Sequence, residues 1–393
     1  MTRLKLLFAC YLATILALFL YSFTQVDLSL TLSKISIYQQ VEKLLQNIGF
    51  FQRPLSALIF SLIFFLLFIF YLTFLFLSKK NKIHLKHLKI LIFSTFIILV
   101  FSYNAFSYDL FNYIFDAKIV TFYHQNPYLF KAIDFVNDPM LSFMRWTHRT
   151  FPYGPVWLML TVPLSFLGMG YFLPTFFIFK ILMGVSFLGS CYLIYKISEK
   201  LFFENKLTNL VFFAFNPLVI TETLVSAHND IPMIFIFLLS IYLFLQNKKL
   251  LAWTSNLLSI GVKFSTGVLF PIFIILEFYD KTKRKINWEK FFIASVFLSL
   301  ATIVFASIRT TFQPWYLIFP LSLCAFVSKK NYILIPFLLA SFFGVLIYFP
   351  YVLMTDYNPS YPMLIKNIET VGVLVFIISA FLFFIKDTLL NKH

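Results

Sequence analysis

The sequence predicts an all-α fold, a polytopic bundle of transmembrane helices. Of its 393 residues, 60% are hydrophobic and 12% are charged, whereas soluble domains carry roughly 25% charged residues. Apolar runs close to the length of a bilayer span recur, as at Leu55–Leu77 and Phe291–Ser307. Such runs cross membranes as helices, because a helix satisfies its own backbone polar groups in lipid. We expect about 11–13 apolar helices in one membrane domain, residues 1–393.

The net charge of +16 orients the chain and does not indicate a nucleic-acid partner. The basic residues gather in short loops between apolar runs, namely Lys79–Lys89, Lys248–Lys249, Lys281–Lys285 and Lys329–Lys330. The positive-inside rule places such loops in the cytoplasm of a plasma-membrane protein. The three cysteines all lie within apolar runs, so neither a disulfide nor a metal framework is expected.

The N-terminal third is expected to hold three spans and one surface helix. Leu4–Phe23 resembles a signal peptide but lacks a small-residue cleavage site, so we expect an uncleaved first span. Within the outer segment 25–53, apolar residues at helical spacing predict a helix that lies on the membrane surface. Spans over Leu55–Leu77 and Leu88–Phe106 follow, and the second of these leads to the outer face.

The next region poses a problem of parity. Two full crossings over Pro155–Gly168 and Phe172–Ile197 would place the following loop outside, yet the later basic loops favour the inside. We therefore expect Pro155–Gly168 to be re-entrant or tilted. Thr208–Leu224 and Ile231–Leu245 then run outward and inward, and 250–278 forms a hairpin with its tip near 261–266. Four spans complete the bundle: Phe291–Ser307, Trp315–Val327, Tyr332–Tyr348 and Thr370–Ile385.

The segment 107–155 is the longest polar interruption of the apolar sequence. It holds four of the sixteen carboxylates, two of the six arginines and two of the six histidines. Loops that a rigid scaffold positions often carry function, so we predict an outer functional loop here. If the helix of the preceding span continues, Asp109, Tyr113 and Asp116 share one face. A partly buried Asp109 would have a raised pKa and serve as a better base; otherwise it is a solvated carboxylate at a helix end.

Two proline-containing motifs in this loop have two interpretations. Asn126-Pro127-Tyr128 and Pro152-Tyr153-Gly154-Pro155 are turn sequences, in which proline fixes φ and glycine permits a positive φ. Their tyrosines also offer an apolar face with a polar tip to a ligand. Between these motifs, Arg145, His148 and Arg149 could contact lipid phosphates or an anionic ligand.

Further polar clusters fall on the same outer side. Ionisable residues at membrane depth are candidates for function, and they occur at His228-Asn229-Asp230, at Lys263 and from Arg309 to Tyr316. The first cluster could bind hydroxyl groups, but no second His or Cys cluster completes a metal site. Lys263 and Arg309 could neutralise a phosphate or extend along the bilayer to its polar surface. Glu222 is expected to face the protein interior.

Six motifs occur in a characteristic order between Ser107 and Tyr316. They are Asp109-Leu110-Phe111-Asn112-Tyr113, Asn126-Pro127-Tyr128, Tyr153-Gly154-Pro155, His228-Asn229-Asp230, Lys263-Phe264-Ser265 and Pro314-Trp315-Tyr316. This order resembles that of membrane glycosyltransferases of the GT-C fold, in particular the bacterial α-mannosyltransferases that depend on polyprenol-phosphate mannose. The chain departs from many such families in having three spans and a surface helix before the loop.

The resemblance implies transfer of a sugar, mannose in the first instance, from a polyprenyl phosphate to a glycan or lipid-linked acceptor outside the plasma membrane. Asp109 would be the general base, with Asp116 as the second candidate, and the anomeric carbon would invert. Lys263 and Arg309 would bind phosphate, and no metal cofactor is expected. The implied substrate-binding residues are Tyr113, Asn126, Tyr128, Tyr153, His228, Asn229, Asp230, Trp315 and Tyr316.

Three alternatives remain open at this point. A lipid or glycolipid transporter or flippase fits the helix number and the buried charges, although such proteins usually show internal repeats, and none is evident in the sequence. A GT-C enzyme could use another sugar or a protein acceptor. A non-catalytic assembly subunit would tolerate an apolar residue in place of Asp109.

Overall fold

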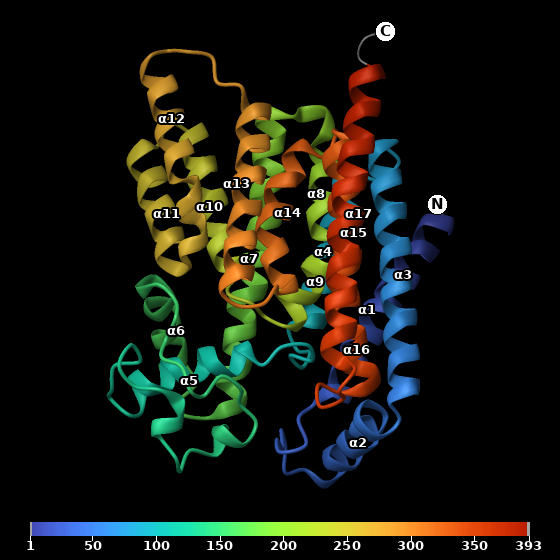
Figure 1. Ribbon diagram of the computed structural model, residues 1–393, viewed down its shortest axis with the longest axis vertical. Coiled ribbons are helices and arrows are strands. Elements are labelled where there is room, and N and C mark those ends of the chain that lie inside the picture. The colour runs from blue at the N-terminus through green and yellow to red at the C-terminus, as the bar shows by residue number, and fades with distance from the viewer. Residues whose placement is uncertain (1, 391–393) are drawn as a thin grey trace.

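The computed structural model describes residues 2–390, and in that range all regular structure is helical. The predicted all-α polytopic bundle is therefore confirmed. Figure 1 shows long helices standing side by side along the longest axis, with α2, α5 and α6 at one end. Within the described range, six helical segments are long and apolar enough to cross a membrane, namely Arg3–Gln25, Arg53–Lys79, Phe172–Leu201, Trp288–Arg309, Asn331–Met354 and Tyr361–Leu389.

The N-terminal third follows the predicted order. Helix α1 (Thr2–Ser22) and helix α3 (Arg53–Lys79) form the first two spans. The helix between them, α2 (Ser36–Gln46), exposes Ile37, Val41 and Leu44 along one side. This amphipathic helix lies at the end of the bundle in Figure 1, as expected for a helix on a membrane surface.

The third span is shorter than predicted. Helix α4 (Leu85–Leu99) ends well before Phe106, and α5 (Asp109–Thr121) is a separate helix. The helix of the span therefore does not continue into Asp109, and the predicted end at Phe106 was too late. Side chains explain the break: Ser102 Oγ donates to the carbonyl of Leu99, and Asn104 Nδ2 donates to that of Ser107. Such local bonds compete with the helical pattern.

The parity problem is answered by the short helix α6 (Pro155–Leu167). This helix lies beside α5 at one end of the molecule in Figure 1, whereas the 30-residue α7 (Phe172–Leu201) runs to the other end. At that far end Lys200 Nζ donates to the carbonyl of Leu245, next to the basic loop at Lys248. The loop after α7 therefore lies on the side of the basic loops, as a re-entrant or tilted α6 requires.

The centre of the bundle is a broken helix. Helices α8 (Lys206–Ala214) and α9 (Pro217–Ile220), the latter continued by a π-helical turn at Thr221–Val225, meet at a bend of 53°. The break follows from Asn216, whose Oδ1 accepts from Leu218 N and caps α9 ahead of Pro217. Every residue from Thr208 to Ile234 is buried, which places the motif His228-Asn229-Asp230 in the core.

The second half contains the predicted hairpin. Helix α10 (Asp230–Leu245) leads into α11 (Lys249–Val262), and a 3-10 turn at Phe264–Leu269 connects α11 to α12 (Phe270–Lys281). The hairpin tip is therefore where the sequence indicated, with Lys263 at the turn. The remaining helices are α13 (Trp288–Arg309), α14 (Ile318–Cys324), α15 (Asn331–Leu346), α16 (Tyr348–Met354) and α17 (Tyr361–Leu390).

Candidate functional site

The site is built around the N-terminus of α5. Asp109 is the first residue of this helix, and its backbone N–H donates to Ser107 Oγ at 3.1 Å. Tyr113 and Asp116 follow at intervals of one and two turns, so the three side chains share a face. Asp109 and Tyr113 are buried, whereas Asp116 is partly exposed. The predicted shared face therefore exists on a helix of its own.

A line of polar side chains runs inward from Asp109. Its Oδ2 lies 3.7 Å from His228 Nδ1, and His228 Nε2 lies 3.3 Å from Glu222 Oε2. Glu222 accepts a 2.6 Å hydrogen bond from the hydroxyl of Tyr348. The indole of Trp315 stacks on His228, with ring centroids 3.9 Å apart and planes 17° apart. The imidazole thus lies between two carboxylates, although neither of its nitrogens makes a hydrogen bond among the described residues.

The backbone before His228 explains this orientation. The N–H of His228 bonds to the carbonyl of Glu222 at 3.0 Å, which closes a wide turn. Ala227 has a φ of 59°, a left-handed conformation that is uncommon for a residue other than glycine. Such strain persists where the surrounding structure enforces it, often at functional sites.

A cation from the hairpin completes the cluster. Lys263 Nζ pairs with Asp230 Oδ2 at 2.7 Å and lies 5.7 Å from the ring centroid of Tyr316. Asp230 is almost fully buried, whereas Lys263 is partly exposed. The ammonium group of Lys263 therefore lies at the surface of the cluster, and the buried Asp230 partly balances its charge.

The end of the polar loop is fixed to the hairpin by two glycines. A Cβ on Gly154 would fall 2.1 Å from the carbonyl oxygen of Gly261. The φ of Gly154 is −74°, so the turn does not use the positive φ that glycine permits, and the glycine is needed for close approach instead. The neighbouring Tyr153 packs edge-on against Tyr113 with centroids 5.4 Å apart.

The charges around α5 affect both of its carboxylates. Burial raises the pKa of Asp109, while the positive charges of Arg149 and Lys263 oppose the rise. Burial also raises the pKa of Asp116, to about 7, against the opposing charge of Arg149. A carboxylate with a raised pKa is better suited to accept a proton near neutral pH.

The structure gathers most of the predicted site residues. Asp109, Tyr113, Tyr153, His228, Asn229, Asp230, Lys263, Trp315 and Tyr316 all join the contacts around the cluster. Asn229 enters through its backbone N–H, which lies 3.5 Å from the hydroxyl of Tyr113. Their roles in substrate binding stay predictions.

Three predicted residues lie apart from the cluster. Asn126 Oδ1 accepts from Tyr128 N, and the Tyr128 hydroxyl donates to the carbonyl of Tyr153. These two residues therefore shape the loop, as the turn interpretation holds. Arg309 ends α13 and is exposed. Within residues 2–390 no hydrogen bond or ion pair joins its side chain to the cluster.

Sequence reasoning gave no site role to Glu222, Tyr348 or Trp157. Glu222 was expected in the protein interior. Its position, a carboxylate six residues before a histidine in an apolar run, could have indicated a role in the site. Tyr348 gave no signal, because a tyrosine in an apolar span is common. Trp157, edge-on to Tyr113 at 5.3 Å, was likewise indistinguishable from a core residue.

Known proteins identify the chain's family. Residues 25–278, which are more than half of the chain, match the family described as alpha-(1->6)-mannopyranosyltransferase, N-terminal domain. No curated protein and no solved structure matches. The matched range includes the polar loop, the motif His228-Asn229-Asp230 and Lys263. Among residues 2–390, six helices are long and apolar enough to cross a membrane. This chain therefore belongs to the alpha-(1->6)-mannopyranosyltransferase family and is a multi-pass membrane glycosyltransferase.

Proposed function

We propose that the protein is a GT-C enzyme that transfers mannose from a polyprenyl-phosphate donor to a glycan or lipid-linked acceptor. The observation that carries the proposal is the placement of Asp109, a buried carboxylate, beside His228 and within the electrostatic reach of Lys263. This arrangement provides a base and a cation around one point, which is what transfer from a sugar phosphate needs.

The proposed transfer needs only the acceptor, the donor and the side chains of the site. The acceptor hydroxyl gives its proton to the Asp109 carboxylate, and its oxygen forms a bond to the anomeric carbon of mannose. On the opposite side the bond from that carbon to the phosphate oxygen breaks, so the configuration inverts. The electron pair of that bond leaves with the lipid phosphate.

The leaving phosphate gains negative charge as the bond breaks. Lys263 is partly exposed at the edge of the cluster and Arg149 is partly exposed in the loop, and both act electrostatically on Asp109. Cations held in place before the reaction stabilise such developing charge without reorganising. His228, held by Trp315 and Glu222, orients the Asp109 carboxylate from its buried side.

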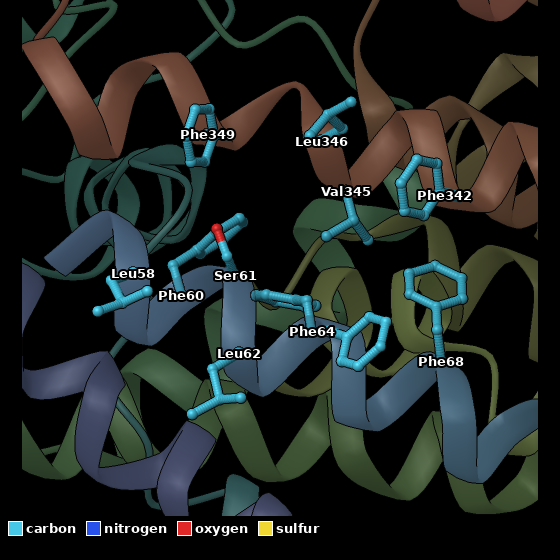
Figure 2. A pocket seen from close by; sticks show the side chains of 11 residues that line it. Leu58, Phe60, Ser61, Leu62, Phe64, Phe68, Phe342, Val345, Leu346 and Phe349 are labelled. Atoms are coloured by element: carbon cyan, nitrogen blue, oxygen red, sulfur yellow. The ribbon is translucent and has the colours of Figure 1, made fainter. Parts of the chain in front are cut away.

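An apolar groove next to the site supports a lipid-linked donor. Figure 2 shows the groove between Phe60, Phe64 and Phe68 of α3 and residues of α15 and α16, with a volume of about 430 Å³. Tyr348 adjoins the groove residue Phe349 and bonds to Glu222. Its ring also packs on Phe106, 5.1 Å away, three residues before Asp109. We assign the groove to the isoprenoid chain of the donor.

The orientation of the helices supports an extracytoplasmic site in the plasma membrane. The basic loops meet at one end of the bundle, where Lys249 pairs with Asp280 and Lys330 with Glu289. Helices α5 and α6 lie at the opposite end in Figure 1. Under the positive-inside rule, the Asp109 end therefore faces away from the cytoplasm. Because a base and fixed cations supply the chemistry, we expect no metal requirement.

The test is transfer of radiolabel by the purified protein in detergent, from polyprenyl-phosphate mannose to a crude extract of membrane glycans. Label in a new product that is absent with Asp109→Asn supports the proposal. The matched control is Asp134→Asn, an exposed aspartate of the same loop, which should retain transfer. Transfer from another lipid-phosphate sugar alone would change the donor. No transfer from any such donor would contradict the proposal and favour a flippase, to be assayed in liposomes.

A further inference from the structure

A second pocket lies on the other side of α5. It has a volume of about 300 Å³ and is lined by Ile114, Lys118 and Thr121 of this helix. Asp109, Tyr113 and Asp116 occupy different positions of the helical turn, so the pocket opens away from the transfer centre. Three separate parts of the chain close it: the segment at Leu30 and Thr31, the loop at 138–143, and the junction of α6 with α7.

The pocket is lined mainly by apolar side chains, and its few polar groups carry little net charge. Lys118 Nζ lies 2.5 Å from Asp138 Oδ2, and Asp138 also accepts from the Tyr123 hydroxyl and from Met140 N. Because this carboxylate balances the cation, the pocket offers no excess charge to a phosphate or a lipid headgroup. Its electrostatics therefore favour a neutral ligand.

Hydroxyl groups supply the remaining polarity. Thr121 Oγ1 and Ser165 Oγ lie 3.0 Å apart in the wall, and Thr31 is exposed at the edge. Hydroxyl groups both donate and accept, which matches a ligand that is itself rich in hydroxyls. A purely apolar ligand would offer the hydroxyl groups of this wall no hydrogen-bond partner.

Two aromatic rings are exposed at the pocket. Phe122 is 61% exposed and Tyr171 is 67% exposed, and both line the pocket. Exposed aromatic residues at a concave site often mark binding. The C–H face of a sugar ring packs on such a ring while its hydroxyls reach the polar wall. Few precisely placed polar groups among apolar ones are typical of small-ligand sites.

We propose that this pocket binds a non-reacting neutral sugar of the glycan acceptor. The proposal rests on the proposed function for the existence of such an acceptor. At 1.5 Å per residue, the pocket residues Ile114 to Thr121 lie about 8–18 Å from Asp109 along the axis of α5. They also lie on the other side of the helix, so one sugar cannot occupy both places. An acceptor must therefore carry several sugars to use the pocket, and its contribution depends on acceptor length.

Calorimetric titration of the purified protein with a neutral α-linked mannooligosaccharide tests this. The background is the Asp109→Asn variant, so that no turnover intervenes. Adding Tyr171→Ala or Thr121→Val should weaken binding by a few-fold to about tenfold, the loss of one ring contact or one hydrogen bond. Tyr357→Ala removes an exposed tyrosine outside the pocket and should leave binding unchanged.

Kinetics in the wild-type background separate this site from the transfer centre. Tyr171→Ala should raise KM for a long acceptor with kcat unchanged, and should leave a monosaccharide acceptor unaffected. Because calorimetry needs no transfer, it still reports on the pocket if the proposed function fails. Oligosaccharide binding that neither variant weakens, or no binding to the protein, would overturn the proposal.

Discussion

Asp109 and His228 come from distant parts of the chain and face each other with Oδ2 and Nδ1 3.7 Å apart. Asp109 begins α5, and His228 lies in the turn between the broken span and α10. The histidine is held from behind by Glu222 and from its face by Trp315. The carboxylate thus lies next to a side chain that belongs to the buried core, while its own helix belongs to the loop region.

This relationship predicts the effect of Asp109→Asn. The amide is nearly the same size as the carboxylate but cannot accept the acceptor proton. We expect transfer to fall by about 10²–10⁴-fold, the usual contribution of a general base, with thermal unfolding little changed. Turnover close to that of the wild type would contradict the assignment and move it to Asp116, whose Asp116→Asn variant is the parallel measurement.

The pH dependence follows from the burial of Asp109. Its carboxyl must be ionised to accept a proton, so transfer is lost as the pH falls through its pKa. Because burial raises the pKa of Asp109, this loss should occur above the ordinary aspartate value of about 3.9. The measurement is kcat/KM against pH, with the donor saturating.

The variant Arg149→Gln tests the pKa of Asp109 by removing a nearby positive charge. Removing this cation should raise the pKa of Asp109 further and move the acid loss of activity to higher pH. Arg145→Gln is the matched control, because Arg145 pairs with Asp356 at 2.6 Å instead. Equal profiles for Arg149→Gln and the wild type would argue against Asp109 as the titrating base.

The sequence predicted the fold well where the signal is local. The length of the apolar runs predicted the spans, and apolar residues at helical spacing predicted the surface helix α2. The hairpin carrying Lys263 was predicted because both ends are basic and its middle is polar. What failed was the end of the third span, since the side-chain bonds of Ser102 and Asn104 that stop α4 leave no periodic signal.

The site was predictable only in part for a related reason. Motif order identified Asp109, His228 and Lys263, but Tyr348 joins Glu222 from a helix far along the chain. Pairings of this kind depend on how helices pack, which sequence spacing does not reveal. Lys180 is a second example, because it donates to Ser102 Oγ and to the carbonyl of Val225.

The two predicted phosphate-binding residues, Lys263 and Arg309, can be compared directly by substitution. Lys263 belongs to the cluster through Asp230, whereas Arg309 is exposed at the end of α13. We expect Lys263→Gln to lower kcat by about 10²–10³-fold, as loss of a preorganised charge does, and Lys263→Arg to restore part of it. Arg309→Gln should change kcat little. Equal losses would place both cations at the leaving phosphate.

A chelator tests the expectation that no metal takes part. Treatment of the purified enzyme with EDTA, followed by removal of the chelator, should leave the rate of transfer unchanged. Loss of activity that added Mg²⁺ or Mn²⁺ restores would contradict a mechanism based on Asp109 and fixed cations alone.

Gly154 connects the polar loop to the hairpin, and its substitution tests whether that contact positions the site. A Cβ would lie 2.1 Å from the Gly261 carbonyl oxygen, so Gly154→Ala must separate α6 from α11. We expect a loss of about 1–3 kcal/mol in stability, as for other overpacked sites, and a larger relative loss of kcat, because Tyr153 and Lys263 move apart. Gly267→Ala is the control, since its Cβ would meet Ile260 only at 3.7 Å. Thermal unfolding and turnover of the two variants, measured together, separate the effects: unchanged kcat in a destabilised Gly154→Ala would mean that the contact serves stability alone.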